Sequence, residues 1–253
     1  MPEFHHEITY PDGRFFEGEV RHAPDMPFLD PDVRGKTVLD LATNDGFFAF
    51  WSEWNGAKSV TAVDVGTYEG YDWGPRGAPE GIGDLPQQDK FSAFDVHHKN
   101  LKSKVKKVVG SVYDINEDYD IIFNYGLLYH LRHPVLALEK CYEHCREVMY
   151  LSTEVLHKLA SAERKTPISY SAGGRGGGRV MATDFFIPTE ACVVVWLHMA
   201  GWNYIFVQRP GTEGGQTRQR FICCKTPTAA ERARKNKNFH EADDAYWNEV
   251  FGQ

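Results

Sequence analysis

A short segment near residue 40 constrains the fold of this chain more than any other feature. Residues 38–48 read VLDLATNDGFF, an apolar run that ends in a turn of small and polar residues before two aromatic residues. A second apolar run, residues 60–63, ends on Asp64, eighteen residues after Gly46. A strand, a tight turn, a helix and an acid at the end of the next strand form the nucleotide-binding half of a Rossmann-type unit. We therefore expect a parallel α/β sheet with a ligand site where these strands end.

This turn lacks the G-x-G-x-x-G spacing of dinucleotide-binding folds. Asp40 stands where the strand meets the turn, and Gly46 is the single glycine at the start of the helix. Several glycines are needed where the backbone must approach a pyrophosphate closely. The pattern therefore predicts a nucleoside ligand without a pyrophosphate, such as S-adenosylmethionine (SAM), with Asp64 binding the two ribose hydroxyls.

The rest of the chain alternates between apolar strands and helices. Strands are expected at residues 37–41, 59–64, 105–109, 120–124, 148–152, 204–208 and 220–224, and helices at 46–55, 89–98, 134–145 and 189–200. The last two strands have no helix between them and should pair antiparallel. The prediction is an α/β fold, a Rossmann-like seven-stranded mixed sheet with helices on both faces and an antiparallel last strand.

Composition divides the chain into a central domain and attached segments. The central domain is expected to span residues 36–226. Residues 1–35 form an N-terminal extension that could fold over the ligand as a lid. Residues 155–183 interrupt the alternation with a glycine-rich run and predict a flexible insertion near the active site. Residues 227–253 are charged and predict a helical tail.

Charge and cysteine usage exclude several classes of protein. The net charge is −7, so the chain as a whole has no electrostatic attraction to nucleic acid or to an anionic membrane. No apolar stretch is long enough to span a bilayer and no secretory signal begins the chain, so we expect a cytoplasmic protein without a membrane partner. The five cysteines lack C-x-x-C spacing, which argues against disulfides or a zinc site. We expect neutral or buried thiols and no metal, although Cys141 and Cys145 could chelate from one helix.

Four strand ends should converge on the ligand, because open α/β sheets bind ligands at the carboxyl ends of their strands. An acid at a strand end is, by itself, often only a helix cap, so the prediction depends on the whole set occurring in order. The predicted cofactor-binding residues are Asp40, Ala42, Asn44 and Gly46 after the first strand, Asp64 and Val65 after the second, Ser111, Val112 and Tyr113 after the third, and Asn124, Tyr125 and Tyr129 after the fourth.

Four segments, in the same order along the chain, resemble motifs of a known enzyme group. Residues 126–134 read GLLYHLRHP and resemble the G-V-L-Y-H-x-R-x-P segment of the tRNA wobble-uridine carboxymethyltransferases and their relatives. Residues 38–48, 151–156 and 185–189 resemble the VLDIGCNDGFF, L-E-T-L-V and Y-F-I-P-S segments found there. The resemblance covers roughly residues 35–225. It implies a class I SAM-dependent methyltransferase, with SAM as cofactor and S-adenosylhomocysteine (SAH) as product.

One position departs from that group. The tRNA enzymes are expected to carry an arginine just before the Y-F-I-P segment, where it binds the extra carboxylate of carboxy-SAM. Ala182 stands there in this chain and cannot pair with a carboxylate. We therefore predict plain SAM and transfer of a methyl group, unless Arg179 replaces the missing arginine.

Candidate catalytic residues follow the fourth and fifth strands. Tyr129 and His130 lie where the methyl acceptor should enter. Imidazole titrates near neutrality, so His130 could be the general base, or it could only cap the loop and orient the next helix. Tyr129 is expected to shape the pocket or touch the cofactor. Glu154 could bind an acceptor amine, act as a base, or form an ion pair with Arg132.

Cationic residues supply candidates for binding the acceptor. Arg132, Arg175 and Arg179 could hold its phosphate or carboxylate, although the last two lie on a glycine-rich run that is either a lid or a disordered surface loop. A lysine cluster spans residues 99–107 and predicts a solvated connection or, as a minority reading, an RNA-binding patch.

Three functions remain open from the sequence. The first is methyl transfer to an oxygen or nitrogen of a small-molecule or sugar-type acceptor. The second is modification of the tRNA wobble uridine, and the third is a non-catalytic SAM-binding partner subunit. A homo-oligomer is possible in each case. Acceptor identity cannot be derived from the fold, because a fold and its cofactor site persist through changes of substrate.

Overall fold

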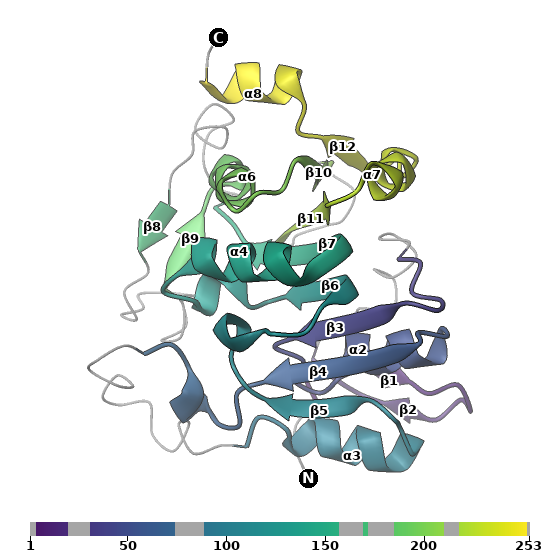
Figure 1. Ribbon diagram of the computed structural model, residues 1–253. Coiled ribbons are helices and arrows are strands. Elements are labelled where there is room, and N and C mark those ends of the chain that lie inside the picture. Colours follow the sequence, from purple (N-terminus) through teal and green to yellow (C-terminus); the bar gives the residue numbers. More distant parts are fainter. Residues whose placement is uncertain are drawn as a thin grey trace.

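A mixed sheet of eight strands forms the centre of the part of the chain that the structure describes. The computed structural model describes residues 4–19, 31–73, 89–156, 169–171, 185–209 and 218–251 (Figure 1). The strand order is β12-β10-β11-β7-β6-β3-β4-β5. The strands are β3 (Thr37–Leu41), β4 (Ser59–Asp64), β5 (Lys106–Val109), β6 (Tyr119–Tyr125), β7 (Cys145–Glu154), β10 (Tyr204–Gln208), β11 (Arg218–Cys224) and β12 (Phe239–Glu241).

The pairing confirms the predicted mixed sheet and corrects its strand count. Strands β3 to β7 are parallel, and β11 pairs antiparallel with both β7 and β10. The eighth strand, β12, pairs antiparallel with β10. It interrupts the tail predicted to be helical, between α7 (Pro227–Arg234) and α8 (Asp244–Phe251). Only three residues long, β12 gives no periodic sequence signal, yet it pairs with β10, which would otherwise be the edge strand.

Helices bury both faces of the sheet, as the sequence predicts. One apolar core joins the sheet to α2 (Phe47–Trp54), α3 (Ser92–Leu101) and α7. The other joins it to α4 (Pro134–His144), α6 (Glu190–Met199) and α8. The inner parallel strands β3, β4 and β6 are buried along most of their length because both of their faces are covered, whereas the edge strand β5 is largely exposed. Two short pairs lie outside this sheet, β1 (Ile8–Thr9) with β2 (Phe15–Phe16) and β8 (Ser169–Ser171) with β9 (Phe186–Pro188).

The N-terminal extension packs onto the same face as α2 and α3. The Tyr10 hydroxyl lies 2.7 Å from Nδ1 of His97 on α3. The backbone N–H of His6 donates to Asp45, in the turn before α2, at 2.7 Å. His5, His6 and Glu19 reach the cavity described below, so the extension contributes to the wall of the ligand site.

Buried acids hold the turn between β3 and α2. Ala42 and Asn44 have φ of 54° and 52°, in the left-handed region that non-glycine residues rarely adopt. Asp40 accepts hydrogen bonds from the Thr43 hydroxyl at 2.6 Å and the Ala49 N–H at 3.1 Å. Burial raises the pKa of Asp40 to about 7 in spite of these bonds.

Gly46 begins α2 and should not tolerate a side chain. Its φ is 88°, and an added Cβ would lie 2.4 Å from a Phe50 ring carbon and 2.7 Å from one of Phe94. Gly46→Ala should destabilise the fold by about 2–5 kcal/mol, the sum of left-handed strain and overpacking. Gly35→Ala is the control, because Gly35 has φ of 72° with nothing within 4 Å of the new atom. Urea unfolding should give a clearly larger loss for Gly46→Ala, and equal losses would contradict the packing argument.

Asp40 should make stability depend on pH in an unusual direction. Its pKa is about 7 in the folded protein, whereas an unfolded aspartate titrates near 4. The folded state therefore binds more protons between these values, and the free energy of unfolding should fall as pH rises through this window. Asp40→Asn should remove this component of the slope, measured by urea unfolding at pH 4.5–7.5.

Asp120→Asn is the matched control for that measurement. Burial raises the pKa of Asp120, but hydrogen bonds from Thr37 and the charges of Arg146 and Lys36 together lower it by more, so it titrates below this window. The slope should be the same in Asp120→Asn as in the wild type. An unchanged slope in Asp40→Asn would show that Asp40 is already ionised in the folded state.

Candidate functional site

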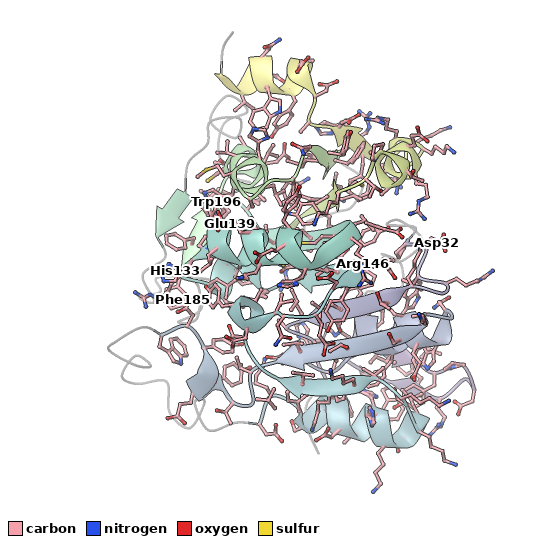
Figure 2. All side chains as sticks on the ribbon, viewed as in Figure 1. Asp32, His133, Glu139, Arg146, Phe185 and Trp196 are labelled. Carbon is pink, nitrogen blue, oxygen red and sulfur yellow. The ribbon has the colours of Figure 1, made fainter. Side chains whose placement is uncertain are left out.

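A cavity of about 570 Å³ lies at the carboxyl ends of β3, β4, β5 and β6. Figure 1 shows these ends on the side of β8 and β9, and Figure 2 shows His133 and Phe185 on that side, with Asp32 and Arg146 at the opposite edge. The strand ends converge, so their side chains share one space. The predicted residues that line it are Ala42, Asn44, Asp64, Val65, Ser111, Val112, Tyr113, Tyr125, Tyr129 and His130.

Asp64 connects the first two strand ends. Its side chain is buried, and its Oδ2 accepts a hydrogen bond from the Asn44 N–H at 2.9 Å. Its Oδ1 accepts from the Val65 N–H at 2.8 Å. Burial raises the pKa of Asp64, although Lys90 and these two N–H groups oppose the rise. The carboxyl group is thus fixed by backbone on both sides while it faces the cavity.

Lys90 lies in the same cavity and was not predicted from the sequence. Its ammonium lies 4.6 Å from the centre of the Tyr68 ring and 5.7 Å from that of Tyr71. Burial lowers the pKa of Lys90, but the Asp64 carboxylate and the tyrosine hydroxyls raise it by more. Lys90 therefore remains a cation, and it is the positive charge that faces Asp64.

Asp72 links the loop after β4 to the third strand end. Its Oδ2 accepts from the Tyr113 hydroxyl and from the Arg132 N–H, both at 2.9 Å. The Ser111 hydroxyl accepts from the Tyr113 N–H at 3.3 Å. These contacts hold Tyr113 both at its backbone N–H and at its hydroxyl, so its ring has a defined place in the cavity wall.

The part of the cavity after β6 contains an arginine, Arg218. Arg218 donates from Nη2 to the Tyr129 hydroxyl at 2.8 Å, and its Nε lies 3.5 Å from Oε1 of Glu154. The Tyr129 carbonyl accepts from the Phe185 N–H at 2.8 Å. The Tyr129 and His130 ring centres are 4.1 Å apart. This part of the cavity therefore combines a cation, a phenol and an imidazole.

Three predicted cofactor residues lie outside the cavity lining. Asp40 is buried under the turn, where it binds Thr43 and Ala49. Gly46 acts through its backbone conformation, beneath Phe50 and Phe94. Asn124 faces α4, where its Nδ2 lies 3.8 Å from the Cys141 sulfur. The first two support the turn from behind, and the prediction for Asn124 chose the wrong face of β6.

The residues predicted to bind or deprotonate the acceptor also differ in position from the prediction. Glu154 does not line the cavity and pairs with Arg218 rather than with Arg132. Arg132 contributes its backbone N–H to Asp72, and its side chain is not part of the cavity wall. Arg175 and Arg179, like Ala182, lie outside the described residues.

Some of the missed residues had a readable signal. Arg218 begins β11, and because β11 is antiparallel to β7, its first residue pairs with Glu154 at the carboxyl end of β7. The antiparallel last strand therefore predicts that Arg218 reaches the site. Lys90 lies before α3, which begins at Ser92 and not at residue 89 as predicted, and His6 lies on the N-terminal extension. No periodicity indicates which side chains of these segments return to the sheet.

Several absences concern only the described part of the chain. Within it, no helix has the length and apolar character needed to cross a membrane. No group of three or more His, Cys, Asp or Glu side chains among these residues is placed to hold a metal ion. The five cysteines are unbridged and buried, and burial raises the pKa of Cys141 to about 12. The expectation of buried thiols is thus confirmed.

Comparison with known proteins agrees with this geometry. No protein-family model matches the chain. Over 174 residues it is 27% identical to the tRNA U34 carboxymethyltransferase of Pseudomonas paraeruginosa, a match that covers 68% of this chain and 46% of that protein. The chain thus spans about half the length of this curated relative.

Solved structures give the fold. A SAM-dependent methyltransferase from Mesorhizobium loti superposes with a TM-score of 0.55 at 11% identity, over 81% of this chain and 97% of its own. The N-terminal domain of EvdMO1, with SAH and D-fucose, has a TM-score of 0.56 at 14% identity, over 87% and 91%. With the observed strand order, these similarities show that the chain has the fold of the class I SAM-dependent methyltransferases.

Proposed function

We propose that this chain is a SAM-dependent methyltransferase that acts on an oxygen or nitrogen of a small-molecule or sugar-type acceptor. The observation that carries the proposal is the Asp64 carboxyl group, buried at the end of β4 and facing a cavity at the strand ends. Ligand sites typically have volumes of about 300–1,000 Å³, and the cavity lies within that range.

The residues present fit the cofactor. Asp64 would accept hydrogen bonds from the ribose hydroxyls, while Val112 and Tyr113 would pack against the adenine ring. The turn at residues 42–44 brings backbone to the opposite wall. Bound SAM supplies an activated methyl group. The chain's own contribution is to orient the acceptor, exclude water and receive the acceptor's proton.

Two features favour a small acceptor over RNA. The lysine cluster lies around the amino end of β5, whereas the cavity lies at the carboxyl end of this strand. Within it, Lys106 pairs with Glu117 at 3.0 Å and Lys107 with Asp95 at 2.7 Å. Cations already paired with carboxylates release fewer counterions from a phosphate backbone.

Loss of Asp64 should remove cofactor binding. Asp64→Ala should weaken SAH at least about 100-fold, because two hydrogen bonds to a charged group together contribute about 3 kcal/mol or more. Asp95→Ala, which removes an exposed acid on α3, is the control and should leave the affinity unchanged. Isothermal titration calorimetry gives both values. Equal affinities in Asp64→Ala and the wild type would remove Asp64 from the cofactor site.

A second candidate is tRNA wobble-uridine modification with carboxy-SAM. The sequence similarity to the Pseudomonas enzyme favours it. The cavity also contains the Arg218 guanidinium, so a cation that could pair with a carboxylate is present although residue 182 is alanine. This candidate would require Arg218 to break its ion pair with Glu154, or to bind the carboxylates of Glu154 and carboxy-SAM together.

The two candidates differ in their dependence on Arg218. We expect SAM to support methyl transfer, and Arg218→Met to change SAH affinity by less than about threefold, since SAH lacks the additional carboxylate with which the Arg218 guanidinium would pair. Calorimetry gives the affinities for SAM and carboxy-SAM. Mass spectrometry of products from sugars and bulk tRNA then identifies the group that is transferred and its acceptor. Tighter binding of carboxy-SAM that is lost in Arg218→Met but kept in Arg218→Lys would favour the tRNA function instead.

A further inference from the structure

His6 and Asp45 form a buried pair beside the cavity that the proposed function leaves unused. The backbone N–H of His6 donates to Oδ2 of Asp45 at 2.7 Å, and His6 Nδ1 lies 2.5 Å from Oδ1. Both side chains are buried, and His6 also lines the cavity. The imidazole is therefore held by a carboxylate on one side while its ring borders the ligand space.

The carboxylate determines which nitrogen carries the proton. Burial raises the pKa of Asp45, but the charge that His6 has when protonated and the two hydrogen bonds from His6 hold it below its usual value. The hydrogen bonds act on the carboxylate also when the imidazole is neutral. An ionised carboxylate can only accept hydrogen bonds, so Nδ1 of His6 must be the donor. A neutral imidazole with its proton on Nδ1 has its basic lone pair on Nε2. A buried aspartate fixes the catalytic histidine of serine proteases in this tautomer.

Other titratable groups also surround the pair. The His5 ring centre lies 4.6 Å from that of His6, and His5 Nδ1 is 3.6 Å from Glu19. His97 on α3 interacts electrostatically with both members of the pair. Asp45 is the acid hydrogen-bonded to His6, so it has the largest influence on the tautomer.

Ring contacts place His6 on the β6 side of the cavity. Its ring centre lies 5.3 Å from Phe47 and 6.0 Å from Phe48, in the first turn of α2. The Phe48 ring lies 4.4 Å from Tyr125, which lines the cavity at the end of β6. Tyr129 follows on the same connection. His6 thus approaches the β6 side of the cavity rather than the Ser111–Tyr113 wall.

We propose that His6, positioned by Asp45, is the general base that deprotonates the methyl acceptor. This inference rests on the proposed function. The acceptor oxygen or nitrogen forms a bond to the methyl carbon as the carbon–sulfur bond breaks, and the electron pair of that bond stays on sulfur. The acceptor proton moves to Nε2 of His6, and the resulting imidazolium is stabilised by the Asp45 carboxylate. His6 is the catalytic residue, and Asp45 is a positioning residue.

The first test needs no acceptor. Long-range proton–nitrogen NMR of the full chain with labelled histidine, saturated with SAH at pH 7.5, reports which nitrogens of each imidazole are protonated. We expect His6 to carry a proton on Nδ1 and none on Nε2, and Asp45→Asn to abolish this preference. The His6→Asn spectrum, which lacks one resonance set, assigns the signal. A proton on Nε2, alone or with one on Nδ1, would overturn the proposal.

The second test separates a base from a structural clamp. Asparagine keeps a side-chain N–H where Nδ1 of histidine lies, so His6→Asn retains the contact with Asp45 but has no base. We expect kcat to fall about 100-fold or more on the acceptor with the highest SAM turnover, because general bases contribute about 10²–10⁴. SAH affinity should stay within about threefold. A kcat within threefold of the wild type would overturn the proposal, as would a larger loss in His130→Asn.

Failure of the cofactor assignment remains distinguishable from failure of the base. If SAH produces no heat in calorimetry, the proposed function fails. The tautomer of His6 in the ligand-free chain is then measured by the same NMR experiment, and a proton on Nε2 with none on Nδ1 there independently rejects the pairing with Asp45. If SAH binds and His6 has the expected tautomer but His6→Asn keeps its kcat, only the catalytic role fails.

Discussion

Negative charge gathered around one turn is the constraint on which the rest of this structure depends. Asp40, Asp45 and Asp64 are all buried beside the connection from β3 to α2. Burial is the largest cause that raises the pKa of Asp40, and its hydrogen bonds from Thr43 and Ala49 lower it. The charges of Asp45 and Asp64 raise it further. Asp64 faces Lys90 and Asp45 faces His6, whereas Asp40 accepts hydrogen bonds from a hydroxyl and a backbone N–H. The turn tolerates three acids because two face basic side chains and the third holds its proton up to neutral pH.

This arrangement connects the fold to the ligand site. The two basic groups come from segments far from the turn, Lys90 from the residues before α3 and His6 from the N-terminal extension. Each therefore ties a loop to the sheet edge and contributes to the cavity wall. A nucleoside that binds Asp64 meets a carboxyl group already fixed by two backbone N–H groups, so little ordering of the acid is needed on binding.

The sequence predicted what is periodic and missed what depends on long connections. Strands β3, β4 and β6 and the position of Asp64 were readable because each of these strands is largely apolar and ends beside polar residues. Asn124 and Tyr125 were both assigned to the site, yet adjacent residues of a strand point to opposite faces, and Asn124 lies against Cys141 under α4. That error was avoidable from the sequence. Lys90 and His6 were not predictable, because nothing in the sequence before α3 or in the N-terminal extension fixes which side chain meets which acid.

The division between sheet and extension suggests how acceptor chemistry could change while the cofactor site persists. The proposed ribose-binding acid, Asp64, and its backbone donors belong to the β3–β4 region, whereas the proposed base lies 39 residues before Asp45 on a segment outside the main sheet. Replacing that segment would alter the base and one wall of the cavity without disturbing Asp64. Relatives with the same strand order could therefore act on unrelated acceptors, as the separation of function from fold leads one to expect. The extension is then the part of this chain whose residues carry the most information about its acceptor.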